Sequence, residues 1–485
     1  MIFSNFEFFL FLVIVFFLHW YLIPFLYKDA DQQIRAIHIL LLICSYLFYM
    51  NWDWRFGFLI FISTAIDYYA GLIIFDTTSE KVRRSALWIS LTVNLVFILG
   101  FFKYYNFFSS SFNRIMQEGL GFPNSLPILD IVLPVGVSFY TFQSMSYTID
   151  IYRKIIPSEK SFIKFALFVS FFPQLVAGPI VTAKTFIPQL SSLKKLEDIP
   201  FRKSFRYFFM GYFKKVVLSD NVSPIVDLIF NNPESYSSIA VWLAAFLFCI
   251  QIYCDFSGYT DMAYSVALLF GYELPENFRM PFTSLSITEH WRRWHITLST
   301  WLRDYVYISM GGSRAGVLRH RFNLMFTMFV GGIWHGANWT FAVWGLSQGI
   351  LLFIESLLKD FRIKFIKFNY DFLKPSMNVF RWFYTAILTA LFTTCFRADS
   401  LETEWIILGK MFSNQDGILR PYMLKTGLPV LAIVYITHWM GHFIYEKNWK
   451  VHINPRLEFV SYPMLILLFS LFTPDIVIPF VYFQF

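Results

Sequence analysis

Long apolar runs separated by short polar connections dominate the sequence from end to end. A membrane-spanning helix needs about 20 predominantly apolar residues, and runs near that length recur throughout the chain. They lie near residues 6–27, 36–50, 54–75, 85–102, 128–149, 161–182, 205–230, 239–271, 322–354, 380–396, 427–446 and 459–482. This pattern predicts an all-α polytopic membrane protein with roughly 10 to 14 membrane segments.

Proline and glycine interrupt several runs in the middle of the chain. Pro134-Val135-Gly136, Phe172-Pro173 and Gly178-Pro179 fall inside otherwise apolar stretches. Broken helices are tolerated at membrane depth only where they pack inside protein or line a cavity. We therefore expect some re-entrant or interfacial helices in the middle of the chain.

Composition and charge narrow the class of protein. Of 485 residues, 56% are apolar and 15% charged, whereas soluble proteins have roughly 45–50% and 25%. The net charge of +8 arises from short basic clusters between apolar runs, which is typical of cytoplasmic loops and not of a nucleic-acid-binding surface. These clusters are Lys81, Arg83 and Arg84; Arg153 and Lys154; Lys194 and Lys195; Arg202, Lys203 and Arg206; and Lys359, Arg362, Lys364 and Lys367.

The first run, Phe6–Tyr27, predicts a span rather than a cleaved signal peptide, because no basic residue precedes it. Lys28 and Arg35 follow it, so the positive-inside rule places the N-terminus outside. The four cysteines all lie within apolar runs and form no CxxC pair. The sequence therefore indicates neither a disulfide framework nor a metal site.

His335 is the most isolated ionisable residue within the apolar runs. It is the one His, Asp, Glu, Lys or Arg among the 33 residues between Arg321 and Glu355. An ionisable group at membrane depth is costly and is by default a functional candidate. Asn338, three residues on, would reach the imidazole if the segment were helical. The plain alternative is a polar residue that hydrogen-bonds across packed helices.

His295 lies in a stretch, Glu289–Tyr305, that is too charged to span. Helical spacing places His295 and Leu298 on one face, so the stretch predicts an amphipathic helix. In one interpretation this helix only lies in the membrane interface. In the other it carries His295 into a site from the cytoplasmic side, with Arg292 and Arg293 meeting the phosphates of a donor.

Two acidic residues, Asp255 and Asp261, lie inside the run 239–271. They are six positions apart and do not share a helical face, which argues against a paired-carboxylate acid–base site. We expect structural pairing with Arg or hydroxyl groups, with the lining of a polar path as the alternative.

Two common catalytic motifs are excluded. Gly345-Leu346-Ser347-Gln348-Gly349 fits G-x-S-x-G, but that motif needs a strand before its turn, and here it sits in a continuous apolar segment. No G-x-x-x-x-G-K-[ST] sequence occurs, so the chain has no signature of an ATP-driven pump.

Six blocks of the chain carry a resemblance to a known family. They are Leu133–Gln143, Phe172–Ile180, Cys254–Met262, Leu274–Phe278, Trp291–Tyr305 and Gly331–Trp339. Together they resemble the membrane-bound O-acyltransferase family, and within it the bacterial alginate O-acetyltransferase branch. Gln348, the Ser309-Met310 pair and the Glu289-His290 pair depart from that branch, and these departures bear on which polymer is modified.

The resemblance implies a fold and a site. One multi-pass acyltransferase domain would cover residues 1–485, with spans in 1–127, a core over 128–358 and further spans in 376–485. Its helices would form a ring around a central tunnel. The family's membrane histidine falls on His335 and its second motif histidine on His295. The remaining candidates, as supporting or tunnel-lining residues, are Asn338, Asp255, Gln143, Arg292 and Arg293.

The expected chemistry is attack of a hydroxyl on an acyl thioester. A neutral histidine is well suited to take the hydroxyl proton near neutral pH, and Asn338 or the amides near Gly331 and Gly332 would stabilise the oxyanion. Alternatively, His335 carries the acyl group itself. The sequence leaves both open.

The resemblance also implies a donor, partners and a location. The donor would be a cytoplasmic acetyl thioester, acetyl-CoA, with no bound cofactor or metal. The acetyl group would reach an exported alginate-like polysaccharide through a separate exported acetyltransferase, across a bacterial inner membrane. The alternatives are transfer of D-alanine or another acyl group, as toward teichoic acids, and a non-enzymatic transporter, against which the lack of inverted repeats argues.

Overall fold

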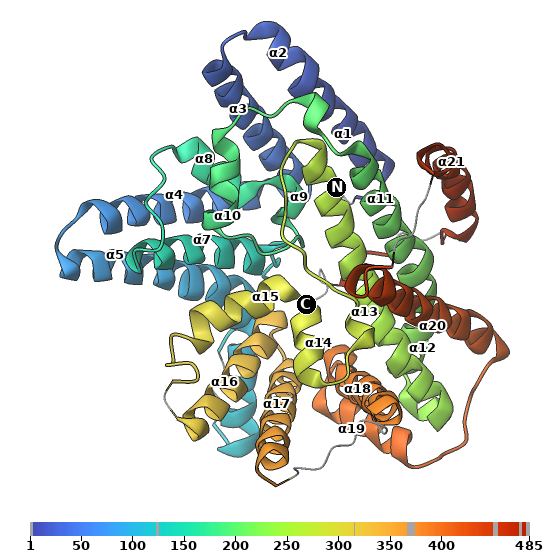
Figure 1. Ribbon diagram of the computed structural model, residues 1–485. Helices are drawn as coiled ribbons and strands as arrows, with labels where there is room; N and C mark the ends of the chain where they lie inside the picture. Colours follow the sequence, from blue (N-terminus) through green and yellow to red (C-terminus); the bar gives the residue numbers. More distant parts are fainter. Residues whose placement is uncertain are drawn as a thin grey trace. The chain divides into compact units, whose positions relative to one another are not determined.

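The computed structural model describes residues 3–122, 126–314, 316–365, 374–449, 454–474 and 478–481. These residues form helices and connections, with one isolated bridge between Tyr236 and Ile418 and no strand (Figure 1). The prediction of an all-α membrane protein is therefore confirmed. Nine helical segments of the described chain are long and apolar enough to cross a membrane, fewer than the 10 to 14 predicted from composition.

The chain divides into two compact units. The first comprises Met1–Met210 and Tyr259–Pro275, and the second comprises Gly211–Gly258 and Glu276–Phe485. The helices of the first unit are α1 (Phe6–Phe17), α2 (Ile23–Leu26), α3 (Ala30–Met50), α4 (Arg55–Asp76), α5 (Glu80–Thr92), α6 (Tyr105–Arg114), α7 (Val137–Tyr152), α8 (Phe162–Ser170), α9 (Phe172–Leu175), α10 (Ala183–Phe186) and most of α11 (Phe201–Tyr212).

The second unit has helices α12 (Asp220–Phe230), α14 (Ile287–Arg293), α15 (Ile296–Trp301), α16 (Val317–His335), α17 (Trp339–Phe365), α18 (Lys374–Arg397), α19 (Leu401–Phe412), α20 (Pro421–Gly441) and α21 (Pro455–Phe472). The long helix α13 (Ser238–Leu269) gives its first two-thirds to this unit and its end to the first.

In the first unit, α4, α5 and α7 pack side by side around a buried acid (Figure 1). Asp67 on α4 is fully buried. Its carboxylate accepts hydrogen bonds from the Ser90 hydroxyl at 2.6 Å and the Asn94 amide at 2.9 Å. Because buried polar groups are costly unless they are hydrogen-bonded, this arrangement accounts for an acid inside a candidate span.

The interruptions in the central runs fall at the prolines and glycines that predicted them. Helix α7 begins only after Gly136, whose φ of 73° is left-handed and whose added Cβ would lie 2.7 Å from the Leu175 carbonyl oxygen. The run 161–182 splits at Phe171 into α8 and the short α9, which has proline in its first turn. These runs therefore make short helices rather than single spans.

In the second unit, the apolar run 322–354 forms two helices instead of one. Helices α16 and α17 fold back on each other as a hairpin (Figure 1). Gly332 makes the close approach possible, because a Cβ there would lie 2.4 Å from the Phe341 carbonyl oxygen and 2.8 Å from Gly345 Cα. The G-x-S-x-G sequence lies inside α17, without the preceding strand that a nucleophile elbow requires.

Candidate functional site

The structure brings His295 and His335 together within the second unit. Their ring centroids lie 6.2 Å apart, although 40 positions separate them in the sequence. His335 ends α16, and His295 lies between α14 and α15. Their exposed fractions are 5% and 0%, so both imidazoles are buried.

The prediction of one continuous helix around His295 is wrong. Helix α14 ends at Arg293 and α15 begins at Ile296, with His295 between them at φ 43° and ψ 53°. Asn277 accounts for the break, because its main-chain oxygen accepts from the amide of Ile296 at 2.9 Å. Its side-chain oxygen accepts from the amide of Thr297 at 3.2 Å. Those two amides would otherwise bond within a continuous helix.

Aromatic rings surround His335 and shape its orientation. The ring centroids of Trp334, Phe396 and Trp344 lie 5.0, 5.1 and 5.2 Å from that of His335. The pairs with Trp344 and Phe396 are edge-to-face, the arrangement favoured by aromatic quadrupoles. The imidazole is therefore held among aromatic rings, and two cavities reach it.

Asn338 does not hold the imidazole of His335, contrary to the expectation from the sequence. The helix stops at His335, and Gly336 turns out of it with φ −156°. The amide of Asn338 instead donates to the Asp399 carbonyl at 2.8 Å, and its oxygen accepts from the Thr340 amide. Asn338 thus caps the start of α17, and an oxyanion role for its side chain would require these bonds to break.

Burial sets the protonation of His295. Its surroundings include the Phe256 ring, with a centroid distance of 4.7 Å, and the Trp334 ring at 6.0 Å. Removal from water disfavours the imidazolium, so burial lowers the pKa of His295 well below its usual range. The ring is therefore uncharged near neutral pH, with one nitrogen protonated and the other bearing a lone pair.

A large cavity of about 1180 Å³ reaches His335 inside the second unit. It is lined along α17 from Trp344 to Lys359, a helical rise of about 22 Å at 1.5 Å per residue. Basic side chains gather on its lining: Arg292, Lys359, Arg381 and Arg303, the last of which is paired with Asp304 at 2.7 Å. An elongated anion would therefore find positive charge at a distance from His335.

The acidic residue of this lining is already occupied. The carboxylate of Glu355 accepts from the amides of Ile287 at 2.6 Å and Thr288 at 2.9 Å, and from the Thr288 hydroxyl at 2.6 Å. These are the first amides of α14, where a negative charge is favoured. Glu355 thus fixes the start of α14 instead of cancelling the basic lining.

A second, small cavity of about 30 Å³ also reaches His335. His335, Trp291 and Trp344 line both cavities. The remaining lining residues are Cys249, Ile252, Phe282, His290, Trp294, Gln348, Thr389, Thr393 and Phe396. A volume of this size holds on the order of two water molecules, and no carboxylate is among its described lining residues.

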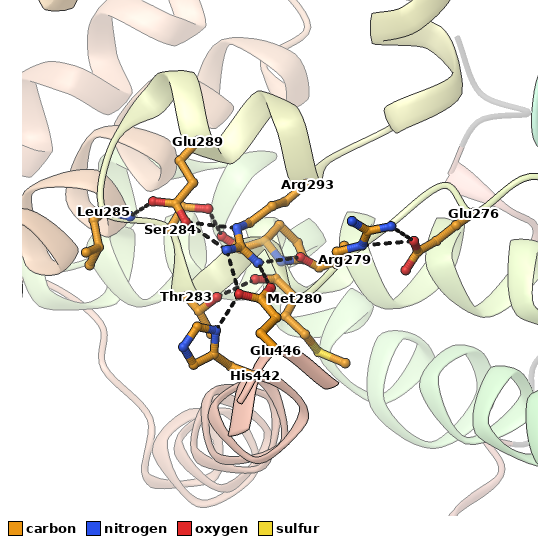
Figure 2. Close-up of polar contacts among 11 residues, drawn as sticks. Glu276, Arg279, Met280, Thr283, Ser284, Leu285, Glu289, Arg293, His442 and Glu446 are labelled. Atoms are coloured by element: carbon orange, nitrogen blue, oxygen red, sulfur yellow. Dashed lines mark hydrogen bonds and ion pairs between the residues drawn. The ribbon is translucent and has the colours of Figure 1, made fainter. Parts of the chain in front are cut away.

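The adjacent arginines have different surroundings. Arg292 is exposed, lines the large cavity and forms no ion pair among the described residues. Arg293 is instead held between Glu289, at 2.8 Å, and Glu446 of the C-terminal part of the chain. Figure 2 shows this network, in which His442 also contacts Glu446 at 3.0 Å. Arg293 therefore joins α14 to the end of α20 and is not free to meet a donor.

Asp255 and Gln143 are both buried and lie in different units. Asp255 pairs with Lys215 at 2.6 Å and accepts from the Val481 amide at 2.8 Å. The expectation of structural pairing holds, although the partner is lysine rather than arginine. Asp255 is not among the residues that line either cavity of the described second unit. Gln143 lies on α7 of the first unit.

Sequence reasoning missed several residues at this site. Asn277 was part of a family-like block, but no spacing marked it as a partner of His295. From the sequence, Lys359 was assigned to a cytoplasmic loop and Arg303 to an amphipathic helix, and Arg381 was not singled out. Their common signal is position: each basic group lies near a helix end that the fold brings to the same cavity. In the described chain no group of three or more His, Cys, Asp or Glu is placed to hold a metal ion.

Comparison with known proteins identifies the family of this chain. The model of the membrane-bound O-acyltransferase family matches residues 152–398. A probable alginate O-acetylase of Azotobacter vinelandii is 38% identical, over 90% of this chain and 84% of that protein. The peptidoglycan O-acetyltransferase of Helicobacter pylori is 35% identical, over 76% of this chain and 73% of its own. The teichoic acid D-alanyltransferase of Streptococcus thermophilus is 28% identical, over 46% of this chain and 56% of its own.

Proposed function

Because this chain belongs to the membrane-bound O-acyltransferase family, we propose that it transfers acetyl groups from a cytoplasmic thioester for O-acetylation of an exported polysaccharide. The chain is a multi-pass O-acyltransferase; the acetyl group, the donor, the polymer and the bacterial inner membrane belong to the proposal. Relatives named for alginate and peptidoglycan O-acetylation support it.

The large cavity is the observation that carries this proposal. Its lining includes both His335 and basic side chains, and it extends along α17 from Trp344 to Lys359, which suits a long donor with phosphates at one end and a thioester at the other. Arginine binds phosphate through charge-assisted hydrogen bonds. The basic sequence that follows Lys359 indicates a cytoplasmic entrance. Acetyl-CoA has this chemistry and is the donor we propose.

The small cavity supports acetyl over a larger or charged acyl group. A space of about 30 Å³ has room for about two water-sized groups, so it suits an acyl group no larger than acetyl. The ammonium group of a D-alanyl donor would need a hydrogen-bonded anion to be buried there, and the described lining contains no carboxylate. The D-alanine alternative is therefore disfavoured at this cavity.

The two histidines are the proposed proton-accepting pair. His335 lines both cavities and is the residue that we assign to the reacting carbonyl. An acceptor hydroxyl attacks that carbonyl, its proton passes to an imidazole nitrogen, and the thiolate leaves and takes up a proton. His295 lines neither of the two cavities in the described part of the chain; its ring centroid lies 6.2 Å from that of His335, and it serves as the neutral second base. The mechanism in which His335 carries the acyl group itself remains the alternative.

A separate exported acetyltransferase is the proposed partner that delivers the acetyl group to the polymer. The sequence has no segment long and polar enough to be a soluble transfer domain of its own. An alginate-like polymer is the acceptor proposed for that partner.

Reconstitution tests the proposal directly. The full-length protein is placed in liposomes with labelled acetyl-CoA on the side of the basic loops, and the exported partner with alginate on the other side. We expect label to leave CoA and cross the membrane, and His335→Ala and His295→Ala to stop it. Retention of label on CoA, together with transfer from a D-alanyl carrier protein, would replace the acetyl proposal with the D-alanine alternative.

A further inference from the structure

A hydrogen-bonded arrangement around Asn277 determines how His295 is held. Asn277 Oδ1 lies 3.2 Å from His295 Nδ1, 3.2 Å from the Thr297 amide nitrogen and 2.9 Å from Thr297 Oγ1. The side chain of Asn277 is 3% exposed. Three groups thus converge on one buried amide oxygen.

These contacts fix the identity of the atoms. The Thr297 main-chain N–H can only donate, so the Asn277 atom that faces it must be the oxygen and not the amide nitrogen. His295 Nδ1 faces the same oxygen and must therefore carry a hydrogen to bond it. In a neutral imidazole only one nitrogen is protonated, which leaves Nε2 with the lone pair.

The backbone supports the same arrangement. The Ile296 amide donates to the Asn277 carbonyl at 2.9 Å, and the Arg279 amide donates to the Arg293 carbonyl at 2.8 Å. The segment from Asn277 to Ile296 is thereby closed into a loop, and Figure 2 shows how Arg293 ties it to Glu446. His295 stands at the closing point in a left-handed conformation, which is uncommon for residues other than glycine but more frequent for asparagine, aspartate and histidine.

From this geometry we infer that Asn277 is a positioning residue, which holds His295 in the tautomer protonated at Nδ1 and so keeps Nε2 as the proton acceptor. The inference rests on the proposed function, because it gives His295 a proton to accept. It adds a residue that acts only through His295 and does not itself touch the donor.

Other charged or titratable groups near His295 are already known from the structure. His335 faces it from α16. On α13, Asp255 directly precedes Phe256, whose ring contacts His295. Asp255 is paired with Lys215. On the loop, Glu276 is paired with Arg279. A change at Asn277 alters none of these pairs directly, so a shift in pH dependence is assigned to His295.

The test compares pH profiles of Asn277→Asp and Asn277→Ala with wild type, using the full-length protein and acetyl-CoA in liposomes. The carboxylate of Asn277→Asp keeps the acceptor but favours the imidazolium, which raises the pKa of His295 by about 1–3 units. Wild type, whose His295 pKa is lowered by burial, should keep its rate as pH falls toward 6. Asn277→Asp should lose its rate as pH falls below about 6, where wild type keeps its rate, and should match wild type above about pH 7.

Asn277→Ala removes the acceptor and frees the tautomer. We expect kcat to fall about 100-fold or more, within the range that general-base catalysis contributes, with little change in the KM for acetyl-CoA. Asn323→Ala is the matched control, because Asn323 is also fully buried and donates to the Met310 and Gly312 carbonyls. It should lower stability without moving the pH profile.

The outcomes separate this inference from the proposed function. If wild type transfers no label, the proposed function fails. If wild type is active, His295→Ala is inactive and Asn277→Asp keeps the wild-type profile, only the positioning role of Asn277 is overturned. A profile that moves equally in Asn277→Asp and Asn323→Ala also overturns it, since a general loss of stability would then explain both.

Discussion

Two groups of buried ionisable side chains lie in the second unit, and they differ in what they face. Lys215, 1% exposed, is enclosed by Asp255 at 2.6 Å and Asp220 at 2.8 Å. His335 is almost as buried but lines two cavities. In the first group the ammonium contacts both carboxylates and each carboxylate contacts the ammonium, whereas the imidazole of His335 borders two cavities.

The difference shows why burial alone does not identify a site. An ionisable residue inside apolar sequence is a functional candidate by default, and Asp255 and His335 both qualified. Breaking a buried ion pair is costly because it leaves an uncompensated charge, so such a pair is committed to structure. A histidine that lines a cavity can meet a substrate there, so His335 is the stronger candidate for chemistry.

The sharpest test of this comparison is the loss of His335. We expect His335→Ala to reduce acetyl transfer by about 10²–10⁴-fold, the share that general-base catalysis supplies. The measurement is label transfer from acetyl-CoA in liposomes. A single sharp peak in size-exclusion chromatography in detergent is the control for folding. A folded variant with wild-type transfer would remove His335 from the mechanism.

Lys215→Met should break the other group. It leaves two buried carboxylates without their cation, which costs about 3–5 kcal/mol of stability. Thermal melting in detergent should show a large drop in Tm, and Lys215→Met combined with Asp255→Asn should recover part of it. The specific activity of the folded fraction should fall far less than in His335→Ala. Equal losses would mean that the ion cluster takes part in catalysis.

The neighbouring arginines offer a smaller, matched comparison. Arg292→Gln should raise the KM for acetyl-CoA about tenfold, as expected for one charge-assisted hydrogen bond, and more strongly at low salt. Arg293→Gln should lower Tm instead, because it leaves Glu289 and Glu446 without their shared cation. A KM effect confined to Arg293→Gln would contradict the placement of both side chains.

The smallest expected effect concerns the small cavity. Thr393→Ala removes two atoms from its lining and should raise the use of propionyl-CoA relative to acetyl-CoA about threefold, since one methylene is worth a few kcal/mol at most in a pocket. Thr385→Ala, one turn or more away on the same helix, serves as the control. Identical acyl preferences in all three proteins would argue that the acetyl group binds elsewhere.

The fold class was predictable from sequence because the bilayer imposes one length and one backbone solution on every span. The histidine pair was predictable only with help from resemblance: isolation marked His335, but nothing in the spacing marked His295. The break at His295 was not predictable, because the local pattern favoured a helix. The break depends on Asn277, 18 positions earlier, which accepts hydrogen bonds from the amides of Ile296 and Thr297.

The roles of the charged residues were the least predictable part. Arg292 and Arg293 are identical in type and adjacent in sequence, and only the position of Glu446, far along the chain, separates their roles. The prediction for Asn338 was wrong because it assumed that the helix continues past His335, whereas α16 ends at that residue. Both cases depend on contacts between distant segments, which periodicity does not record.

The close contact of Gly332 with Gly345 has a consequence for how the protein is made. Helix α16 carries Arg319, Arg321 and Asn323 and is not among the nine described segments apolar enough to cross a membrane, whereas α17 is. During biosynthesis α16 would therefore enter the bilayer poorly by itself. Small residues that let two backbones touch allow helices to associate inside lipid, so we expect the translocon to release α16 and α17 as one hairpin. His335, at the end of α16, would then reach the membrane interior because α16 enters together with the more apolar α17.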